Sequence, residues 1–156
     1  MLHHPALYAT PLSVVSGVGV KSSRAHKRGD FLGFYTGRLV PEDASHSSDA
    51  FEISGTRHLV APRKTDMMRY VNEPPEGKCA NAVAIPLYLP KGNAIAYYAC
   101  KTIVPHTEIW THYGTKYKRD YKVGFEGVAP RKIQRADDVL HRDALKKLDL
   151  YCARRR

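Results

Sequence analysis

The sequence has few cysteines and no apolar run long enough to cross a bilayer. Its three cysteines, Cys79, Cys100 and Cys152, are widely spaced, and no CxC or CxxC motif occurs. Structural zinc normally uses closely spaced ligand pairs, so we expect reduced thiols in an intracellular protein and no metal site. The first residues, "MLHHPALYATPLSVV", lack a basic start followed by a long apolar stretch. We therefore expect neither a signal peptide nor membrane association.

Charge is abundant but unevenly distributed. The formal net charge is +10 over 156 residues, and 43% of the residues are hydrophobic, which is typical of one folded domain. Residues 1–114 carry 12 Lys/Arg and 9 Asp/Glu, whereas residues 115–156 carry 13 and 6. A positive C-terminal surface suits nucleic acid or another polyanion, and it equally suits a solvated face that keeps the protein soluble.

Short runs of branched and aromatic residues, separated by turns, predict strands between residues 12 and 113. Pro86 cannot donate to a sheet ladder, so its strand is expected at an edge or a bulge. "PKGN" at 90–93 predicts a hairpin turn between its flanking strands. The expected strands are "LSVV" (12–15), "VGVK" (18–21), "FLGFYTG" (31–37), "AFEI" (50–53), "RHLVAP" (57–62), "AVAIPLYL" (82–89), "AIAYYACKTIV" (94–104) and "EIWTHYG" (108–114).

The composition changes after Gly114. "TKYKRDYKVGFEGVAPRK" (115–132) is basic, aromatic and glycine-rich, which is typical of an irregular connector. "ADDVLHRDALKKLDLYCARRR" (136–156) then has a helical spacing of apolar residues, with acidic residues first and arginines last. The sequence predicts a mainly β domain followed by an α-helix near residues 136–150.

Four segments contain residues that suggest chemistry. "SGVGV" (16–20) has two glycines that let a ligand approach the backbone, although a plain hairpin turn is the favoured explanation of this motif taken alone. It is not a dinucleotide fingerprint, since no third glycine and no following helix appear. "FYTG" (34–37) and "HTEIWTHYG" (106–114) each include a tyrosine close to a glycine at a strand end. "RYVNEPPEGKCAN" (69–81) has an asparagine on each side of a tight loop, where an amide needs hydrogen-bond partners.

In this order the four segments resemble the motifs of SET-domain protein-lysine methyltransferases. The resemblance covers roughly residues 12 to 117 and is closest to the compact SET proteins of large DNA viruses. It implies a SET fold of several small curved sheets with a pseudoknot-like crossing, occupying residues 1–117. Residues 118–156 would form a basic C-terminal segment that packs on this domain or extends it.

The resemblance also implies a site for S-adenosyl-L-methionine. Gly17, Val18 and Gly19 would pass under the amino-acid end of this cofactor, and the Asn72 side chain would lie near its methionyl portion. Residue 73 would offer its backbone to the adenine. The family has a histidine there, and Glu73 departs from that pattern and would add charge near the adenine.

Further roles follow from the same resemblance. Asn81 would hold the crossing loops together through backbone hydrogen bonds. Tyr113 would be catalytic at the junction of cofactor and lysine, and Tyr35 would line the lysine channel. Thr111 stands where many relatives have an aromatic residue that limits methylation, so we expect room for di- or trimethylation. His112 replaces the family's aspartate, and we assign it no role.

The cysteine-rich segment that follows many SET domains is absent. Tyr117, Tyr121 and Phe125 are therefore the candidates to close the lysine channel, although they would equally pin the C-terminal segment to the sheet.

The first hypothesis is an S-adenosylmethionine-dependent protein-lysine N-methyltransferase acting on a histone tail. The expected location is intracellular, nuclear or chromatin-associated, in a host nucleus if the protein is viral. The basic C-terminal segment would contact nucleosomal DNA, and its helix is the surface expected to pair if the protein forms a homodimer. Two alternatives stay open: a methyltransferase of another lysine-bearing protein, and a non-catalytic SET-like module that binds chromatin or nucleic acid.

Overall fold

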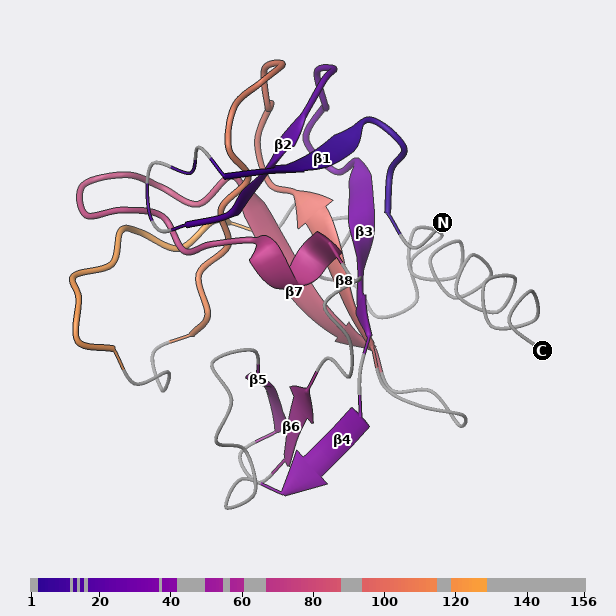
Figure 1. The fold of residues 1–156 in the computed structure, drawn as a ribbon, viewed down its shortest axis with the longest axis vertical. Coiled ribbons are helices and arrows are strands. Elements are labelled where there is room, and N and C mark those ends of the chain that lie inside the picture. The colour runs from indigo at the N-terminus through magenta and orange to yellow at the C-terminus, as the bar shows by residue number, and fades with distance from the viewer. Residues whose placement is uncertain are drawn as a thin grey trace.

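The computed structural model describes residues 3–11, 13, 15, 17–36, 38–41, 50–54, 57–60, 67–87, 94–114 and 119–128. These residues form a mainly β structure of small antiparallel sheets with one 3-10 helix (Figure 1). The elements are β1 (Leu7–Thr10), β2 (Gly19–Ser22), β3 (Phe31–Thr36), β4 (Arg38–Pro41), β5 (Ala50–Ser54), β6 (Arg57–Val60), η2 (Met67–Tyr70), β7 (Ala82–Leu87) and β8 (Ala94–Ala99). The helix expected near residues 136–150 lies outside the described residues.

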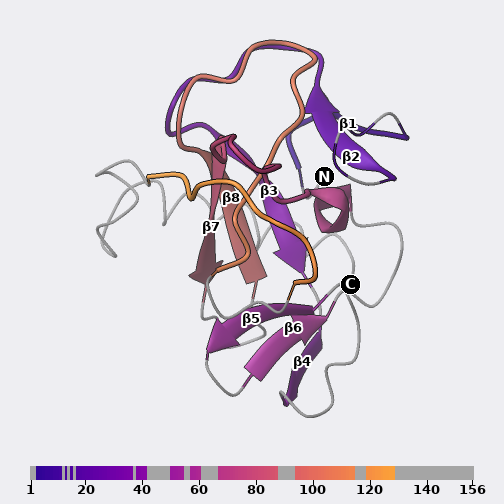
Figure 2. The same cartoon turned by 90° about the vertical axis from the view of Figure 1, so that its left-hand side faces the viewer.

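The strands are arranged in three sheets. The central sheet has the order β3-β8-β7, a two-stranded sheet pairs β1 with β2, and a third sheet has the order β4-β6-β5. In both views β1–β2 lies at one end of the central sheet and β4–β6–β5 at the other (Figures 1 and 2). The prediction of a mainly β architecture is confirmed.

Most expected strands appear, and Pro86 lies on the edge strand β7, as its missing donor requires. Two expectations are wrong. Ser13 and Val15 of "LSVV" lie outside the strands, and β2 pairs instead with β1, from Leu7 opposite Ser22 to Thr10 opposite Gly19. Residues 108–114 form isolated bridges rather than a regular strand, because their backbone hydrogen bonds are divided between β2, where Ile109 bonds to Val20, and the region of the loop 72–81.

The core lies between the central sheet, β1–β2 and η2. Met68 of η2 is buried, and η2 contacts β1, β2 and β3. A side chain at Gly33 would meet the sulfur of Met68, so this glycine lets the helix approach β3. The fully buried members of the apolar cluster include Val20, Leu32, Ile95, Ala99 and Ile109.

Two loops distant in sequence run side by side beyond the central sheet, at residues 22–30 and 99–107 (Figure 2). The backbones of His26 and Ile103 exchange two hydrogen bonds of 2.9 Å. The His26 ring is buried, and its Nε2 lies 2.6 Å from Oγ of Ser22. We refer to residues 22–30 and 99–107 as the paired loops.

Candidate functional site

Three hydrogen bonds join residues 71–73 to Thr111 and Tyr113. The backbone N–H of Thr111 donates to the carbonyl of Asn72 at 3.0 Å. The Tyr113 hydroxyl donates to the carbonyl of Val71 at 2.6 Å, and the Tyr113 N–H donates to Oε2 of Glu73 at 2.7 Å. Tyr113 is therefore fixed both at its backbone and at its phenolic oxygen, by the two residues that flank Asn72.

Residues 108–113 are also held from the other end of the loop 72–81. The Asn81 amide is 4% exposed, and its Nδ2 donates to the Glu108 carbonyl at 2.9 Å. Its Oδ1 accepts from the Trp110 N–H at 2.8 Å, and the Asn81 N–H donates to the Trp110 carbonyl at 3.2 Å. One donor and one acceptor on the same amide hold two backbone positions, so both ends of the loop 72–81 bond to this segment.

The Asn72 side chain reaches a third segment, near Val18. Its Nδ2 lies within hydrogen-bond distance of three acceptors: the Val18 carbonyl at 3.0 Å, Ser13 Oγ at 3.1 Å and Glu108 Oε1 at 3.1 Å. Ser13 Oγ in turn donates to Glu108 Oε1 at 2.6 Å. The Glu108 side chain is buried, so its carboxylate is stabilised by these neighbours rather than by water.

Local structure explains why glycine stands on each side of Val18. Gly17 has a φ of 48°, in the left-handed region that residues with a Cβ rarely adopt. A Cβ at Gly19 would collide with the Glu108 carboxylate and press against Ser13. Gly19 therefore makes room for a buried carboxylate, a reason that the sequence pattern did not indicate.

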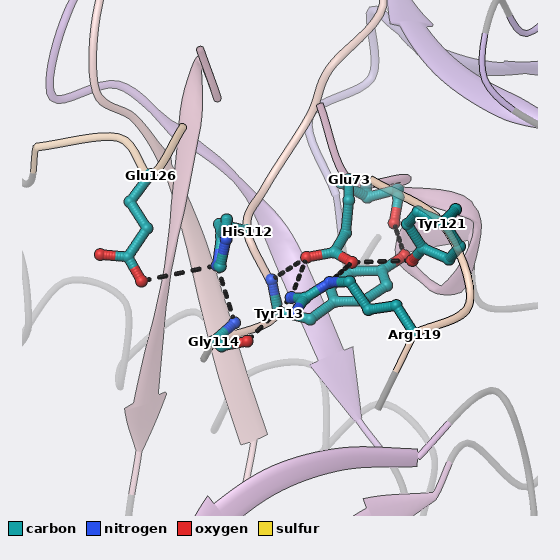
Figure 3. A network of polar contacts seen from close by, with 8 residues as sticks. Glu73, His112, Tyr113, Gly114, Arg119, Tyr121 and Glu126 are labelled. Atoms are coloured by element: carbon teal, nitrogen blue, oxygen red, sulfur yellow. Dashed lines mark hydrogen bonds and ion pairs between the residues drawn. The ribbon is translucent and has the colours of Figure 1, made fainter. Parts of the chain in front are cut away.

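A buried charge network surrounds the Glu73 carboxylate, which accepts the Tyr113 N–H (Figure 3). The Glu73 carboxylate, 2% exposed as a residue, accepts from Arg119 Nε and Nη2, each at 2.7 Å, and from the Tyr121 hydroxyl at 2.7 Å. Arg119 Nη2 also donates to the Gly114 carbonyl at 2.8 Å. One guanidinium thus contacts both the acceptor of the Tyr113 N–H and the residue that follows Tyr113.

These contacts set the protonation states of the pair. Burial by itself raises the pKa of Glu73, but hydrogen bonds from Arg119, the Tyr113 N–H and Tyr121 outweigh it, and the pKa lies below its ordinary value. The hydrogen bond to Glu73 raises the pKa of Arg119, against a smaller effect of burial. Glu73 and Arg119 are therefore both charged at neutral pH.

His112 has two neighbours that compete for one nitrogen. Its Nδ1 accepts the Gly114 N–H at 3.0 Å and lies 3.5 Å from Oε1 of Glu126 (Figure 3). A ring nitrogen that accepts a hydrogen bond carries no proton, so it cannot donate to Glu126 at the same time. The Gly114 bond has the better geometry, and in this structure His112 supports the turn after Tyr113.

Hydrogen bonds connect several of the residues expected at a site: Val18, Asn72, Glu73, Tyr113 and Tyr121. The Glu73 carboxylate, expected to add charge near the adenine, is bound within the protein by Arg119 and Tyr121. Arg119 was not anticipated. No signal in the sequence identifies it, because Glu73 stands in a loop that also contains Glu76 and Lys78, where an acidic residue is usually exposed.

The remaining expected residues that the structure describes differ in burial and in their contacts. Tyr35, on β3, is 3% exposed and belongs to the same buried cluster as Val71. Thr111, two residues before Tyr113 in the sequence, is also buried. Phe125 is 63% exposed and lies outside the Glu73 network, while its backbone bonds to the loop 72–81. Tyr117 lies outside the described residues.

No protein-family model matches the chain, and no curated protein matches it in sequence. Among the described residues, no group of three or more His, Cys, Asp or Glu side chains is placed to hold a metal ion. Within the same part of the chain, no helix is long and apolar enough to span a membrane.

Proposed function

We propose that the protein is an S-adenosylmethionine-dependent protein-lysine N-methyltransferase with a SET fold. The observation that carries the proposal is the junction at Asn72. Its backbone bonds to the segment that ends at Tyr113, and its side chain bonds to Val18 between the two glycines. Segments separated by dozens of residues, each singled out for its chemistry, therefore meet at one residue.

The hydrogen bonds of residues 108–113 support the same proposal. Residues 108–113 bond to both ends of the loop 72–81 through Asn72 and Asn81, as a pseudoknot-like crossing requires. In the proposed fold residues 1–117 form the SET domain, and residues 118–156 add a basic segment with a helix near 136–150.

The cofactor site fits the residues that are present. The Val18 carbonyl, Ser13 Oγ and the Glu108 carboxylate converge on the Asn72 amide. Such acceptors suit the ammonium group at the amino-acid end of S-adenosylmethionine, and the adenine is assigned to the backbone of residue 73. When bound, the cofactor would supply a methyl group on a sulfonium, and an uncharged amine would bond to the methyl carbon in line as the thioether sulfur leaves.

Tyr113 orients the lysine amine. A phenolic oxygen that donates to the Val71 carbonyl keeps lone pairs that accept an N–H from the amine and aim the nitrogen along the line of attack. A protonated lysine cannot attack, so the channel lined by Tyr35 must favour the uncharged amine by excluding water. Carbonyls such as that of Val71 add weak C–H···O contacts to the methyl group.

The proposed substrate is a histone tail, with another lysine-bearing protein as the alternative. Thr111 leaves room for di- or trimethylation, and Tyr117, Tyr121 and Phe125 are assigned to the channel's outer wall. Nucleosomal DNA would contact the basic C-terminal segment, which fits a nuclear or chromatin-associated location. A homodimer, if formed, would use the C-terminal helix.

The test is transfer of labelled methyl from S-adenosylmethionine to recombinant nucleosomes by the wild type, Tyr113→Phe and Tyr8→Phe. Tyr8 lies on β1, and its hydroxyl bonds to His106 rather than to the site, so it is the matched control. We expect label on a histone band, a loss of at least about tenfold with Tyr113→Phe, and no loss with Tyr8→Phe. Equal activity of all three proteins would remove Tyr113 from the mechanism.

A non-catalytic module that binds nucleic acid is the second candidate, and the paired loops favour it. Arg24, Lys27, Arg28 and Lys101 are exposed there. Phosphate contacts of this kind give binding that weakens steeply with salt. Fluorescence anisotropy with a labelled duplex would compare the wild type with a variant that has glutamine at these four positions. Duplex binding that depends on the four side chains, with no calorimetric signal for S-adenosylmethionine, would establish the module instead of the enzyme.

A further inference from the structure

Residues 119–125 are docked along the loop 72–81. The Gly124 N–H donates to the Pro74 carbonyl at 2.9 Å, and the Phe125 N–H donates to the Lys78 carbonyl at 2.7 Å. The Ala80 N–H donates back to the Phe125 carbonyl at 2.9 Å. The loop that holds Asn72 and Asn81 therefore has residues 108–113 bonded to its two ends and residues 119–125 bonded along its length.

Gly124 shows how closely this segment approaches. A Cβ at this position would lie 2.5 Å from the Pro75 carbonyl oxygen and would also collide with the Lys78 carbonyl. Both obstacles are backbone atoms, which cannot rotate away. The docking of residues 119–125 is therefore a fitted contact rather than a loose covering of the loop.

Arg119 connects this docked segment to Tyr113. Its guanidinium binds both oxygens of Glu73 and the Gly114 carbonyl, and Oε2 of Glu73 accepts the Tyr113 N–H. The side chains of Glu73 and Arg119 are 1% and 11% exposed. A carboxylate at this depth keeps its charge and its orientation only while a cation is bound to it. The position of the Tyr113 backbone thus depends on a residue six positions further along the chain.

We propose that Arg119 is a positioning residue: it fixes the Glu73 carboxylate against the Tyr113 N–H and thereby sets the phenolic oxygen at which the lysine is aligned. The effect on catalysis rests on the proposed methyltransferase function, whereas the effect on Tyr113 does not. Arginine is required because its planar fork binds two carboxylate oxygens and the Gly114 carbonyl together. Lysine has a single ammonium on a flexible chain and cannot reproduce that set.

The variants are Arg119→Gln, Arg119→Lys and Glu73→Gln, with Lys122→Gln as the matched control. Lys122 lies in the same segment and pairs with Glu76, but the two side chains are 81% and 66% exposed. For each protein, kcat, the Kd for S-adenosylmethionine and the hydrogen-exchange rate of the Tyr113 amide would be measured. We expect kcat to fall about 10- to 100-fold in the three variants, with a cofactor Kd within about threefold of wild type. The Tyr113 amide should exchange at least about tenfold faster, and Lys122→Gln should change none of the three.

A double variant, Glu73→Leu/Arg119→Leu, separates positioning from stability. Replacing a buried ion pair by packed apolar residues often restores folding, but leucine offers no acceptor to the Tyr113 N–H. We expect a folded protein whose kcat stays low and whose Tyr113 amide exchanges fast. Recovery of both wild-type values in this variant would overturn the proposal, because the pair would then be only a structural support.

The two proposals fail in distinguishable ways. If the wild type transfers no methyl group, the exchange rate of the Tyr113 amide still decides the positioning role. Faster exchange in Arg119→Gln and in the double variant would support that role without the enzyme. Unchanged exchange of this amide in Arg119→Gln would overturn it even if the wild type is an active methyltransferase.

Discussion

Glu73 and Arg119 are 46 residues apart and form a buried bidentate ion pair, with Nε and Nη2 each 2.7 Å from a carboxylate oxygen. The Tyr121 hydroxyl and the Tyr113 N–H complete the donors around the same carboxylate. Buried ion pairs are stabilising only when their remaining lone pairs are also bonded. This carboxylate meets that condition, so its removal leaves an arginine without its main partner.

Glu73→Gln should destabilise the protein at pH 7 by about 3 kcal/mol, as breaking buried pairs generally does. The pKa of Glu73 lies below 4.5 in the folded protein and near that value in the unfolded chain. The carboxylate therefore stabilises the fold fully above about pH 4.5, and its contribution is lost as the pH falls through the folded pKa. Urea unfolding between pH 7 and pH 3 should show wild type and variant converging at acid pH. A difference in the free energy of unfolding between wild type and variant that stays constant with pH would contradict this assignment.

Asn81 and Asn72 should have separable functions. Asn81→Ala leaves the buried Trp110 N–H and Glu108 carbonyl without their partners, at an expected cost of about 2–4 kcal/mol in the free energy of unfolding. Asn72→Ala should cost about 1 kcal/mol but should abolish calorimetrically detectable binding of S-adenosylmethionine. The reverse pattern, with Asn81→Ala stable and Asn72→Ala still binding, would refute the division of roles.

Gly19→Ala should be destabilising because of Glu108 rather than because of backbone strain. The added Cβ meets the Glu108 carboxylate, and overpacking of this kind costs about 1–3 kcal/mol. A double-mutant cycle pairs this change with Glu108→Ala. The losses of unfolding free energy in the two single variants should sum to more than the loss in the double variant, by about 1 kcal/mol or more. Additive costs, measured by urea unfolding, would show that the two residues do not compete for space.

The strands of the central sheet could be predicted because branched and aromatic residues dominate them. β1 could not, because "LYAT" and "LSVV" are both short apolar runs upstream of β2. Which of the two runs pairs with β2 depends on which side chains become buried. Leu7 and Thr10 of β1 are buried, and β1 is the strand that pairs. The run 108–114 has strand-like composition, yet its backbone partners are divided between Val20 of β2 and residues 72–82, which only tertiary folding brings near.

The candidate site, like the fold, could be predicted only in part from the sequence. Asn72 and Asn81 could be singled out because an amide beside an apolar run needs partners that are not local. The partners themselves could not be predicted, since they are mostly backbone atoms of other segments. The resemblance predicts Glu73 only as a charge near a ligand, and the docking of residues 119–125 is what brings Arg119 to it.

His26 should make the protein less stable at mildly acidic pH. Burial, followed by the nearby charges of His4 and Arg24, lowers the pKa of His26 below 6.5, although Asp30 opposes this. The unfolded chain binds a proton near pH 6.5 while the folded protein does not, so the free energy of unfolding falls as the pH drops below about 6.5. One such group contributes at most about 1.4 kcal/mol per pH unit. His26→Gln removes the titrating group, and its urea unfolding between pH 7.5 and pH 5 should show a shallower slope than wild type. Identical slopes would mean that the buried ring near Ser22 accepts its proton without penalty.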